Sequence, residues 1–298
     1  MELDQLRYVV AIAEAGNFTK ASDRLKIAQP SLSQQIMKLE REIGHRLFHR
    51  LGRKAVLTEA GLVFLERARK ILFEVENATK ELSDHPGLER RITVGAIPTV
   101  APYLLPPLIE RCKELYPNLQ IDVREIFGTD IVRAVLEGDV DFAIATLPVK
   151  DPRISIELLL KEPLMLVVAK DHPLTKKTEV TAQDIAKETF VMLGSSSSLT
   201  TQIQAFFGDR QFEPRIGFRC AQIATAKLFV GLGYGISILP RAARTPADQK
   251  TLTYLDIPEG NPSRELAILR HLQRFQSRGA EQFIGLLRTH ASTILTGN

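Results

Sequence analysis

A long apolar repeat between Thr58 and Ser83 divides this chain into two unequal parts. Apolar residues recur near a seven-residue repeat, at Leu62, Leu65, Ala68, Leu72, Val75, Ala78 and Leu82. The segment opens with a helix-start signal and ends at Asp84-His85-Pro86-Gly87,. A lone helix between two parts of a chain buries such a stripe best against the same helix of a second subunit; packing onto its own chain is the alternative. The predicted dimer contacts are Leu62, Leu65, Leu72, Val75 and Leu82.

The composition is that of a soluble protein with a core. The 298 residues are 44% hydrophobic and 25% charged, and no apolar run reaches the roughly 18 residues that a membrane helix needs. The segment from Met1 to Gln5 lacks the basic and apolar character of a signal peptide, so we predict a cytoplasmic protein with no membrane partner,. Cys112 and Cys220 are too few and too far apart for a metal cluster or a disulfide framework,. We expect no metal and no cofactor.

The positive charge is concentrated at the N-terminus. Residues 1–58 hold ten Lys or Arg and six Asp or Glu, so they carry the whole formal net charge of +4. The rest of the chain is balanced. A basic segment before a neutral body indicates a polyanionic partner for that segment alone, and a solvated basic face is the alternative.

Three helices are predicted before Gly44: one from residue 3 that Gly16-Asn17 ends, one over 19–25 and one over 30–43,. Thr19 is expected to cap the second helix, Pro30 to occupy the first turn of the third, and Gly44 to end it in the left-handed conformation,. The inner stripe of the third helix is Leu32, Ile36, Leu39 and Ile43. A short helix, a tight turn and a third helix of this kind form a helix-turn-helix.

The outer face of the third helix is suited to DNA. Its hydroxyls and amides, with one lysine, can contact base edges, and nearby cations hold phosphates. The next segment, 45–57, is typical of a basic hairpin with a glycine turn, the wing of a winged helix,. A polar face that is only solvated is the alternative. The predicted DNA contacts are Thr19, Gln29, Pro30, Ser31, Ser33, Gln34, Lys38, Arg50, Arg53 and Lys54.

Several linked motifs resemble one family over about the first 85 residues. They are Leu6-x-x-Val9, Phe18-Thr19-x-Ala21-Ser22-x-x-Leu25, Gln29-Pro30-Ser31-Leu32-Ser33-x-Gln35-Ile36, Leu39-Glu40, Leu47-Phe48-x-Arg50 and Thr58-Glu59-Ala60-Gly61. Together they resemble the N-terminal domain of the LysR-type transcriptional regulators. The resemblance implies binding to double-stranded DNA, contact with RNA polymerase, and a homodimer or a homotetramer.

From Arg91 onward strands alternate with helices, which predicts an α/β fold,. Strands are expected over 92–97, 119–126, 140–145, 163–169, 189–193, 216–220, 235–239 and 265–270, and helices over 102–115, 129–136, 199–207, 223–230 and 280–295. Two such lobes with two crossings resemble the periplasmic-binding-protein-like effector domain of the LysR family. The expected domains are 1–58 (winged helix-turn-helix), 59–87 (linker and dimerisation helix) and 88–298 (effector binding), with lobe I at about 91–162 and 266–298 and lobe II at about 163–265.

A small-molecule effector is expected where loops follow the carboxyl ends of strands and helices begin. The predicted effector contacts are Pro98, Thr99, Val100, Gly128, Thr129, Leu147, Ser195, Ser196, Ser197, Ser198, Cys220 and Ala221. Hydroxyls dominate these segments and no lysine or arginine lies in them, which favours a small anion or a carboxylate held by hydroxyls and helix dipoles. For the serine run alone, a flexible loop with a helix cap is an equal alternative.

Within the family the chain most resembles the peroxide-responsive OxyR branch of activators. The shared motifs are Ile97-Pro98-Thr99-Val100-x-Pro102-Tyr103-Leu104-Leu105-Pro106 and Asp171-His172-Pro173. That branch works through a peroxidatic cysteine, whose position is occupied here by Ser198, and Ser197 replaces the histidine expected before it. Serine forms no sulfenic acid, and Cys220 lies elsewhere, so disulfide-based peroxide sensing is not expected.

Three other functions compete with a ligand-responsive regulator. An enzyme is disfavoured, because no nucleophile elbow, phosphate loop or metal-spaced set of ligands is present,. A transport-type binding protein conflicts with the basic N-terminal segment and the missing signal peptide. A regulator whose C-terminal domain is structural and binds nothing is the main alternative.

Overall fold

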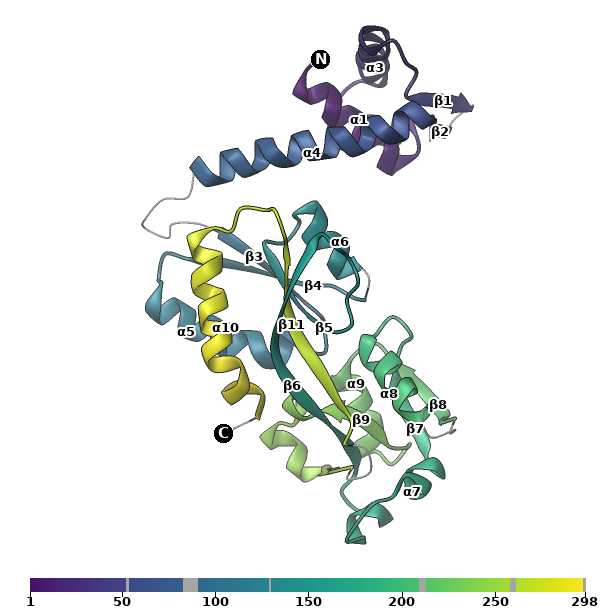
Figure 1. Ribbon diagram of the computed structural model, residues 1–298. Helices are drawn as coiled ribbons and strands as arrows, with labels where there is room; N and C mark the ends of the chain where they lie inside the picture. The colour runs from purple at the N-terminus through teal and green to yellow at the C-terminus, as the bar shows by residue number, and fades with distance from the viewer. Residues whose placement is uncertain (52–53, 83–90, 129, 209–212, 258–260, 297–298) are drawn as a thin grey trace. The chain divides into compact units, whose positions relative to one another are not determined.

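The computed structural model describes residues 1–298 except 52–53, 83–90, 129, 209–212, 258–260 and 297–298 (Figure 1). The chain forms two compact units, Met1–Ser83 and Asp84–Asn298. In the described part of the chain, no helix has both the length and the apolar character needed to cross a membrane.

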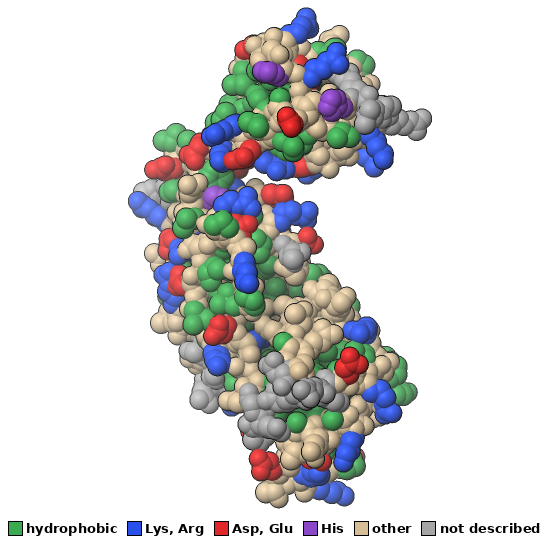
Figure 2. All heavy atoms as spheres, turned by 45° about the vertical axis from the view of Figure 1, so that its right-hand side comes forward, with side chains coloured by type: hydrophobic (Ala, Val, Ile, Leu, Met, Phe, Trp, Pro, Cys, Tyr) green, Lys and Arg blue, Asp and Glu red, His purple; other side chains and the backbone are tan. Residues whose placement is uncertain are grey.

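The N-terminal unit is a helix-turn-helix followed by a hairpin and a long helix. Its elements are α1 (Leu3–Ala15), α2 (Phe18–Leu25), α3 (Gln29–Ile43), β1 (Phe48–Leu51), β2 (Lys54–Leu57) and α4 (Glu59–Leu82). Gly16 and Gly44 end α1 and α3 with φ of 61° and 73°, as left-handed C-caps require. Lys and Arg side chains are spread over the surface of this unit (Figure 2).

The predicted cap of the second helix is wrong by two residues. Asn17 has the extended backbone of an N-cap, and its Oδ1 accepts hydrogen bonds from the backbone N–H groups of Thr19 at 2.8 Å and Lys20 at 3.1 Å. Thr19 therefore lies inside α2 and its side chain is exposed. An amide oxygen at Asn17 satisfies two free N–H groups of the first turn, which Thr19 cannot do from within it.

Hydrogen bonds connect the hairpin segment to α3 and to the start of α4. Glu40 Oε1 in α3 accepts the N–H groups of Leu47 at 2.7 Å and Phe48 at 3.2 Å. Thr58 Oγ1 accepts the N–H of Gly61 at 2.9 Å and donates to the carbonyl of Arg46 at 2.6 Å. The start of α4 is thereby fixed to the hairpin that precedes it.

Some apolar residues of α4 are buried within their own unit, and others are exposed. Leu65 is 9% exposed and Ala68 is 1% exposed; Leu65 belongs to the core of its own unit. Leu62 is 58% exposed and Leu82 is 87% exposed, while Leu72 and Val75 are partly buried. We therefore remove Leu65 from the predicted dimer surface, because its side chain already packs within the chain.

The C-terminal unit is a two-lobed α/β domain. Its strands are β3 (Arg91–Ala96), β4 (Gln120–Glu125), β5 (Phe142–Thr146), β6 (Ile154–Ala169), β7 (Thr189–Leu193), β8 (Arg215–Cys220), β9 (Ser237–Pro240), β10 (Leu252–Leu255) and β11 (Ser263–His271). Its α-helices are α5 (Ala101–Leu115), α6 (Asp130–Glu137), α7 (Ala182–Ala186), α8 (Ser198–Gly208), α9 (Ile223–Gly231) and α10 (Arg278–Thr296). Three short 3₁₀ helices are η1 (Pro173–Lys176), η2 (Arg241–Ala243) and η3 (Pro246–Lys250).

Two strands are shared by both lobes. The main sheet has the order β10-β6-β11-β5-β3-β4, with β9 also paired to β6, and β7 and β8 pair separately in parallel. One apolar core surrounds β3, β5, α5 and α10, and a second surrounds β7, α8, α9 and the end of β6. Antiparallel β6 and β11 run from one lobe to the other (Figure 1). This pair therefore forms the connection about which the lobes are arranged.

Candidate functional site

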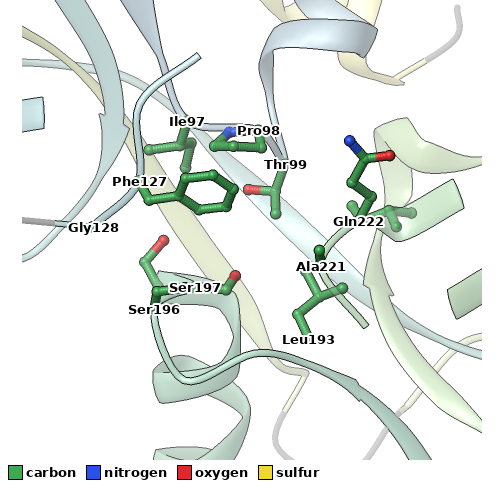
Figure 3. Close-up of a pocket in the computed structure, with 12 residues that line it drawn as sticks. Ile97, Pro98, Thr99, Phe127, Gly128, Leu193, Ser196, Ser197, Ala221 and Gln222 are labelled. Atoms are coloured by element: carbon green, nitrogen blue, oxygen red, sulfur yellow. The ribbon is translucent and has the colours of Figure 1, made fainter. Parts of the chain in front are cut away.

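A cavity lies between the lobes, where helices α5, α8 and α9 begin. The space there that no protein atom fills is about 310 Å³, a figure that includes the open solvent at its mouth. Its walls come from the loops after β3, β4, β7 and β8. The lining residues are Ile97, Pro98, Thr99, Phe127, Gly128, Leu193, Ser196, Ser197, Ser198, Ala221, Gln222 and Ile223 (Figure 3).

Seven of the predicted effector contacts line this cavity: Pro98, Thr99, Gly128, Ser196, Ser197, Ser198 and Ala221. The structure places four others outside its wall. Val100 is 1% exposed and Cys220 is 7% exposed, and both pack in the cores; Ser195 points to solvent, and Leu147 contacts α8 through its carbonyl. Thr129 lies outside the described residues.

An arginine that sequence reasoning missed lies directly behind the cavity. Arg264 in β11 donates from Nη1 to Thr99 Oγ1 at 2.7 Å and from Nη2 to the Thr99 carbonyl at 3.0 Å. Its Nε donates to Glu162 Oε2 at 2.7 Å, and the two side chains are 0% and 1% exposed. Glu162 Oε1 also accepts the N–H of Ala242 at 3.0 Å. Burial lowers the pKa of Arg264, opposed by the neighbouring Glu162 carboxylate.

This arrangement fixes the chemistry of the Thr99 hydroxyl. A threonine hydroxyl has one hydrogen to donate and two lone pairs to accept with. Thr99 Oγ1 accepts from a guanidinium that has no acceptor of its own, so among the described residues its hydrogen remains available to donate. Thr99 is therefore set to bind a hydrogen-bond acceptor in the cavity.

The serines line the wall opposite Thr99 (Figure 3). The turn before α8 is held by the N–H of Ser197 donating to the Gly194 carbonyl at 3.0 Å and by Thr200 Oγ1 donating to the Leu193 carbonyl at 3.0 Å. The first turn of α8 and that of α9 both adjoin the cavity. Free N–H groups and helix dipoles at such termini favour negative charge.

The two thiols are poorly placed for redox chemistry. Cys112 is 0% exposed and Cys220 is 7% exposed, and burial raises the pKa of both thiols. A thiol held neutral is a weak nucleophile. Ser198, in contrast, lines the cavity.

The expected DNA-reading face is largely exposed. Thr19, Gln29, Pro30, Ser31, Gln34, Lys38 and Lys54 have exposed side chains. Ser33 is 8% exposed, on the inner side of α3, so we exclude it from the reading face. Lys38 Nζ lies 3.0 Å from Glu2 Oε1, a pair that a phosphate must compete with. Arg53 and the side chain of Arg50 lie outside the described residues.

Comparison with known proteins identifies the family. The model for the LysR substrate binding domain matches residues 85–292. The model for the bacterial regulatory helix-turn-helix protein of the lysR family matches residues 3–62. The chain belongs to the LysR family of transcriptional regulators. LysR regulators bind DNA and small-molecule effectors, form oligomers and are not enzymes.

OxyR proteins are among the most similar LysR-family members. A hydrogen peroxide-inducible genes activator from Pectobacterium carotovorum subsp. carotovorum is 34% identical over 274 residues, 90% of this chain and 90% of that protein. A full-length OxyR variant from Pseudomonas aeruginosa is 27% identical with a TM-score of 0.70, covering 97% of this chain and 98% of the other. A cysteine-to-serine OxyR mutant from Corynebacterium glutamicum with hydrogen peroxide bound is 27% identical with a TM-score of 0.64, covering 99% and 94%.

Proposed function

We propose that this LysR regulator changes its binding to promoter DNA when a small hydrogen-bond acceptor, an anion or a carboxylate, occupies the cavity between its lobes. The observation that carries the proposal is the Thr99 hydroxyl, which accepts from Arg264 and so donates toward the cavity. The serines and the first turns of two helices add further donors. The effector acts by favouring one arrangement of the subunits over another.

The charge around the cavity supports a small ligand of low charge. None of the described residues that line it is Lys or Arg, and the charge of Arg264 is matched by Glu162. Helix termini and hydroxyls together can hold one carboxylate without a dedicated cation. The OxyR mutant with serine in place of a cysteine holds hydrogen peroxide, so peroxide belongs among the probes even though Ser198 cannot be oxidised to a sulfenic acid.

The test is thermal unfolding of the full chain with acetate, benzoate, phosphate and hydrogen peroxide. A ligand at a hundredfold excess over its dissociation constant stabilises the folded state by about 2.7 kcal/mol. Thr99→Val and Ser198→Ala should abolish the shift, whereas Thr201→Val, an exposed position on the same helix, should keep it. A shift that survives Thr99→Val would refute the role of that hydroxyl. If no probe shifts the transition, a structural C-terminal domain that binds no ligand becomes the better account.

For DNA, we propose that α3 enters the major groove and that the hairpin holds phosphate. Gln29, Pro30, Ser31 and Gln34 would contact bases, and Thr19, Lys38, Arg50, Arg53 and Lys54 the backbone. With a duplex from upstream of its own gene, Gln34→Ala should cost about 1–3 kcal/mol for the cognate sequence. Lys54→Ala should weaken binding to all sequences and reduce the salt slope by about 1. Equal effects from Lys113→Ala, an exposed lysine of the other unit, would refute this placement.

The same account includes a homodimer or homotetramer joined through α4, contact with RNA polymerase, and a cytoplasmic location. Leu62, Leu72, Val75 and Leu82 are the proposed contacts of α4 with its partner helix. Leu62→Glu should lower the molar mass measured by light scattering, because a charge would enter the apolar seam. An unchanged mass would place the subunit contact elsewhere.

A further inference from the structure

Gln202 connects the two lobes beside the cavity. It lies on α8, four residues after Ser198, which puts both side chains on one face of the helix,. Gln202 Nε2 donates to the carbonyl of Leu147 at 3.3 Å. Leu147 follows β5 and packs against the core of the first lobe, whereas α8 belongs to the second. This hydrogen bond therefore crosses from one lobe to the other.

Leu147 is held from both sides. Its N–H donates to the Glu265 carbonyl in β11 at 3.0 Å, and its carbonyl accepts from Gln202. Glu265 is adjacent to Arg264, whose guanidinium bonds Thr99. Hydrogen bonds and one peptide link thus connect Gln202, through Leu147 and β11, to Thr99 in the cavity wall.

The lobes also approach each other closely at Gly128. Gly128 has φ of 45°, and a Cβ atom there would lie 3.1 Å from the Ser196 carbonyl oxygen of the second lobe. Both approaches, Gly128 to Ser196 and Leu147 to Gln202, join the segment around the start of α8 to the first lobe. Among the described residues, these two approaches bring the lobes together beside the cavity.

The side-chain amide of Gln202 makes one long hydrogen bond and leaves one buried atom without a partner among the described residues. At 3.3 Å it is longer than the usual N–H···O distance,. The other amide atom, Gln202 Oε1, is buried and has no hydrogen-bond partner among the described residues. A buried acceptor without a donor costs free energy, whereas the bond to the Leu147 carbonyl stabilises the contact between the lobes,. A ligand that binds at Ser198, one helical turn from Gln202, can therefore strengthen or weaken the bond between Gln202 and Leu147.

We infer that Gln202 is a positioning residue, an interlobe latch that sets the balance between closed and open clefts and transmits occupancy at Ser198 to the first lobe. The part of this inference that concerns a signal from Ser198 rests on the proposed function, because it requires a ligand in the cavity. The effect of Gln202 on the balance between closed and open clefts does not, because it is a property of the protein without ligand. Loss of one neutral hydrogen bond changes the closed-to-open ratio roughly five-fold.

The test is a distance distribution between spin labels at Lys113→Cys in the first lobe and Lys187→Cys in the second, both exposed positions. The native cysteines are buried, so surface labels react selectively. Labelled full chain is mixed with excess unlabelled chain so that only distances within one subunit are read. Gln202→Met should add a second, displaced population, and Gln204→Met, the same change at an exposed position of α8, should not.

A second variant separates a latch from a merely structural side chain. Gln202→Glu should open the cleft while its new carboxylate faces the Leu147 carbonyl, and should close it again when lower pH protonates that carboxyl and restores a donor. Distributions of Gln202→Met or Gln202→Glu that match the wild type would overturn the latch. Because no ligand is present, this result is independent of the effector proposal. If a probe shifts the unfolding of the wild type but the spin-label distances of the Gln202 variants match those of the wild type, the latch is refuted and the proposed function is not.

Discussion

The buried pair Glu162–Arg264 provides the sharpest test of how this domain is held together. The two residues face each other in the register of β6 and β11, the strands that join the lobes. Their side chains are 1% and 0% exposed and are 2.7 Å apart. The perturbations are Glu162→Leu, Arg264→Met and the double substitution, which removes both charges and leaves apolar side chains of comparable size.

The magnitudes follow from what each change leaves behind. Removal of one partner of a buried ion pair costs about 3–5 kcal/mol, because the other charge stays buried without compensation. After Glu162→Leu the guanidinium keeps only its two bonds to Thr99. After the double change the Thr99 carbonyl loses a donor, which costs about 1–3 kcal/mol. The double variant should therefore be more stable than either single one, with a coupling of at least about 3 kcal/mol.

The assay is urea unfolding followed by circular dichroism, since the chain contains no tryptophan. The transition of the N-terminal unit serves as an internal reference that none of these changes should move. Glu114→Leu is the matched control, because the Glu114–Arg111 pair is 58% and 50% exposed. Exposed pairs contribute about 0–1 kcal/mol, so this variant should be close to the wild type.

The pH dependence distinguishes the two single variants. An unpaired buried carboxylate can take up a proton and become neutral, so the cost of Arg264→Met should fall as the pH is lowered. A guanidinium cannot lose its proton in this range, so the cost of Glu162→Leu should stay constant. A coupling below about 0.5 kcal/mol, or singles that cost no more than the exposed control, would refute the reasoning that these charges depend on each other.

Three further predictions concern other parts of the molecule. Cys112 and Cys220 should react with a thiol reagent only on unfolding, and peroxide should leave the intact mass unchanged, because burial raises the pKa of both thiols. Burial and nearby arginines lower the pKa of His271; the unfolded chain thus binds its proton first, and stability should fall as the pH drops below about 6.5. The unfolding midpoint of His271→Gln should show less of this loss; an unchanged loss would contradict the assignment. Gly61→Ala should destabilise the N-terminal unit by about 1–3 kcal/mol, since its Cβ would lie 2.1 Å from the Leu47 carbonyl oxygen, and an unaffected calorimetric transition would count against that clash.

Regular elements with a strong period were predictable from the sequence, and elements defined by tertiary partners were not. The strand β7 was predicted with its observed bounds, Thr189–Leu193. In contrast, only the apolar end of β6 was predicted, because Glu157 and Glu162 interrupt its first part. In the structure Glu157 pairs with Arg288 and Arg270, and Glu162 with Arg264. A strand whose charges are neutralised by distant residues has no local apolar pattern to reveal it.

The candidate site shows the same division. Thr99 and the serines were found because loops after strands and before helices mark a ligand site in α/β folds. Arg264 was not found, since it comes 165 residues after Thr99 and lies within a strand. Arg264 is one of several charged residues in β11, beside Glu265 and Arg270, so no local signal singles it out.

The position of Arg264 also explains why the cavity and the interlobe strands should respond together. One guanidinium bonds the Thr99 wall of the cavity and, through Glu162, the first residues of η2 that follow β9. A ligand that accepts a hydrogen bond from the Thr99 hydroxyl acts on a group that is bonded to Arg264 of β11, and Arg264 in turn bonds Glu162 of β6. Ligand binding at Thr99 can therefore be coupled to β6 and β11 without a long pathway, because the buried Arg264 side chain contacts both the Thr99 hydroxyl and Glu162,.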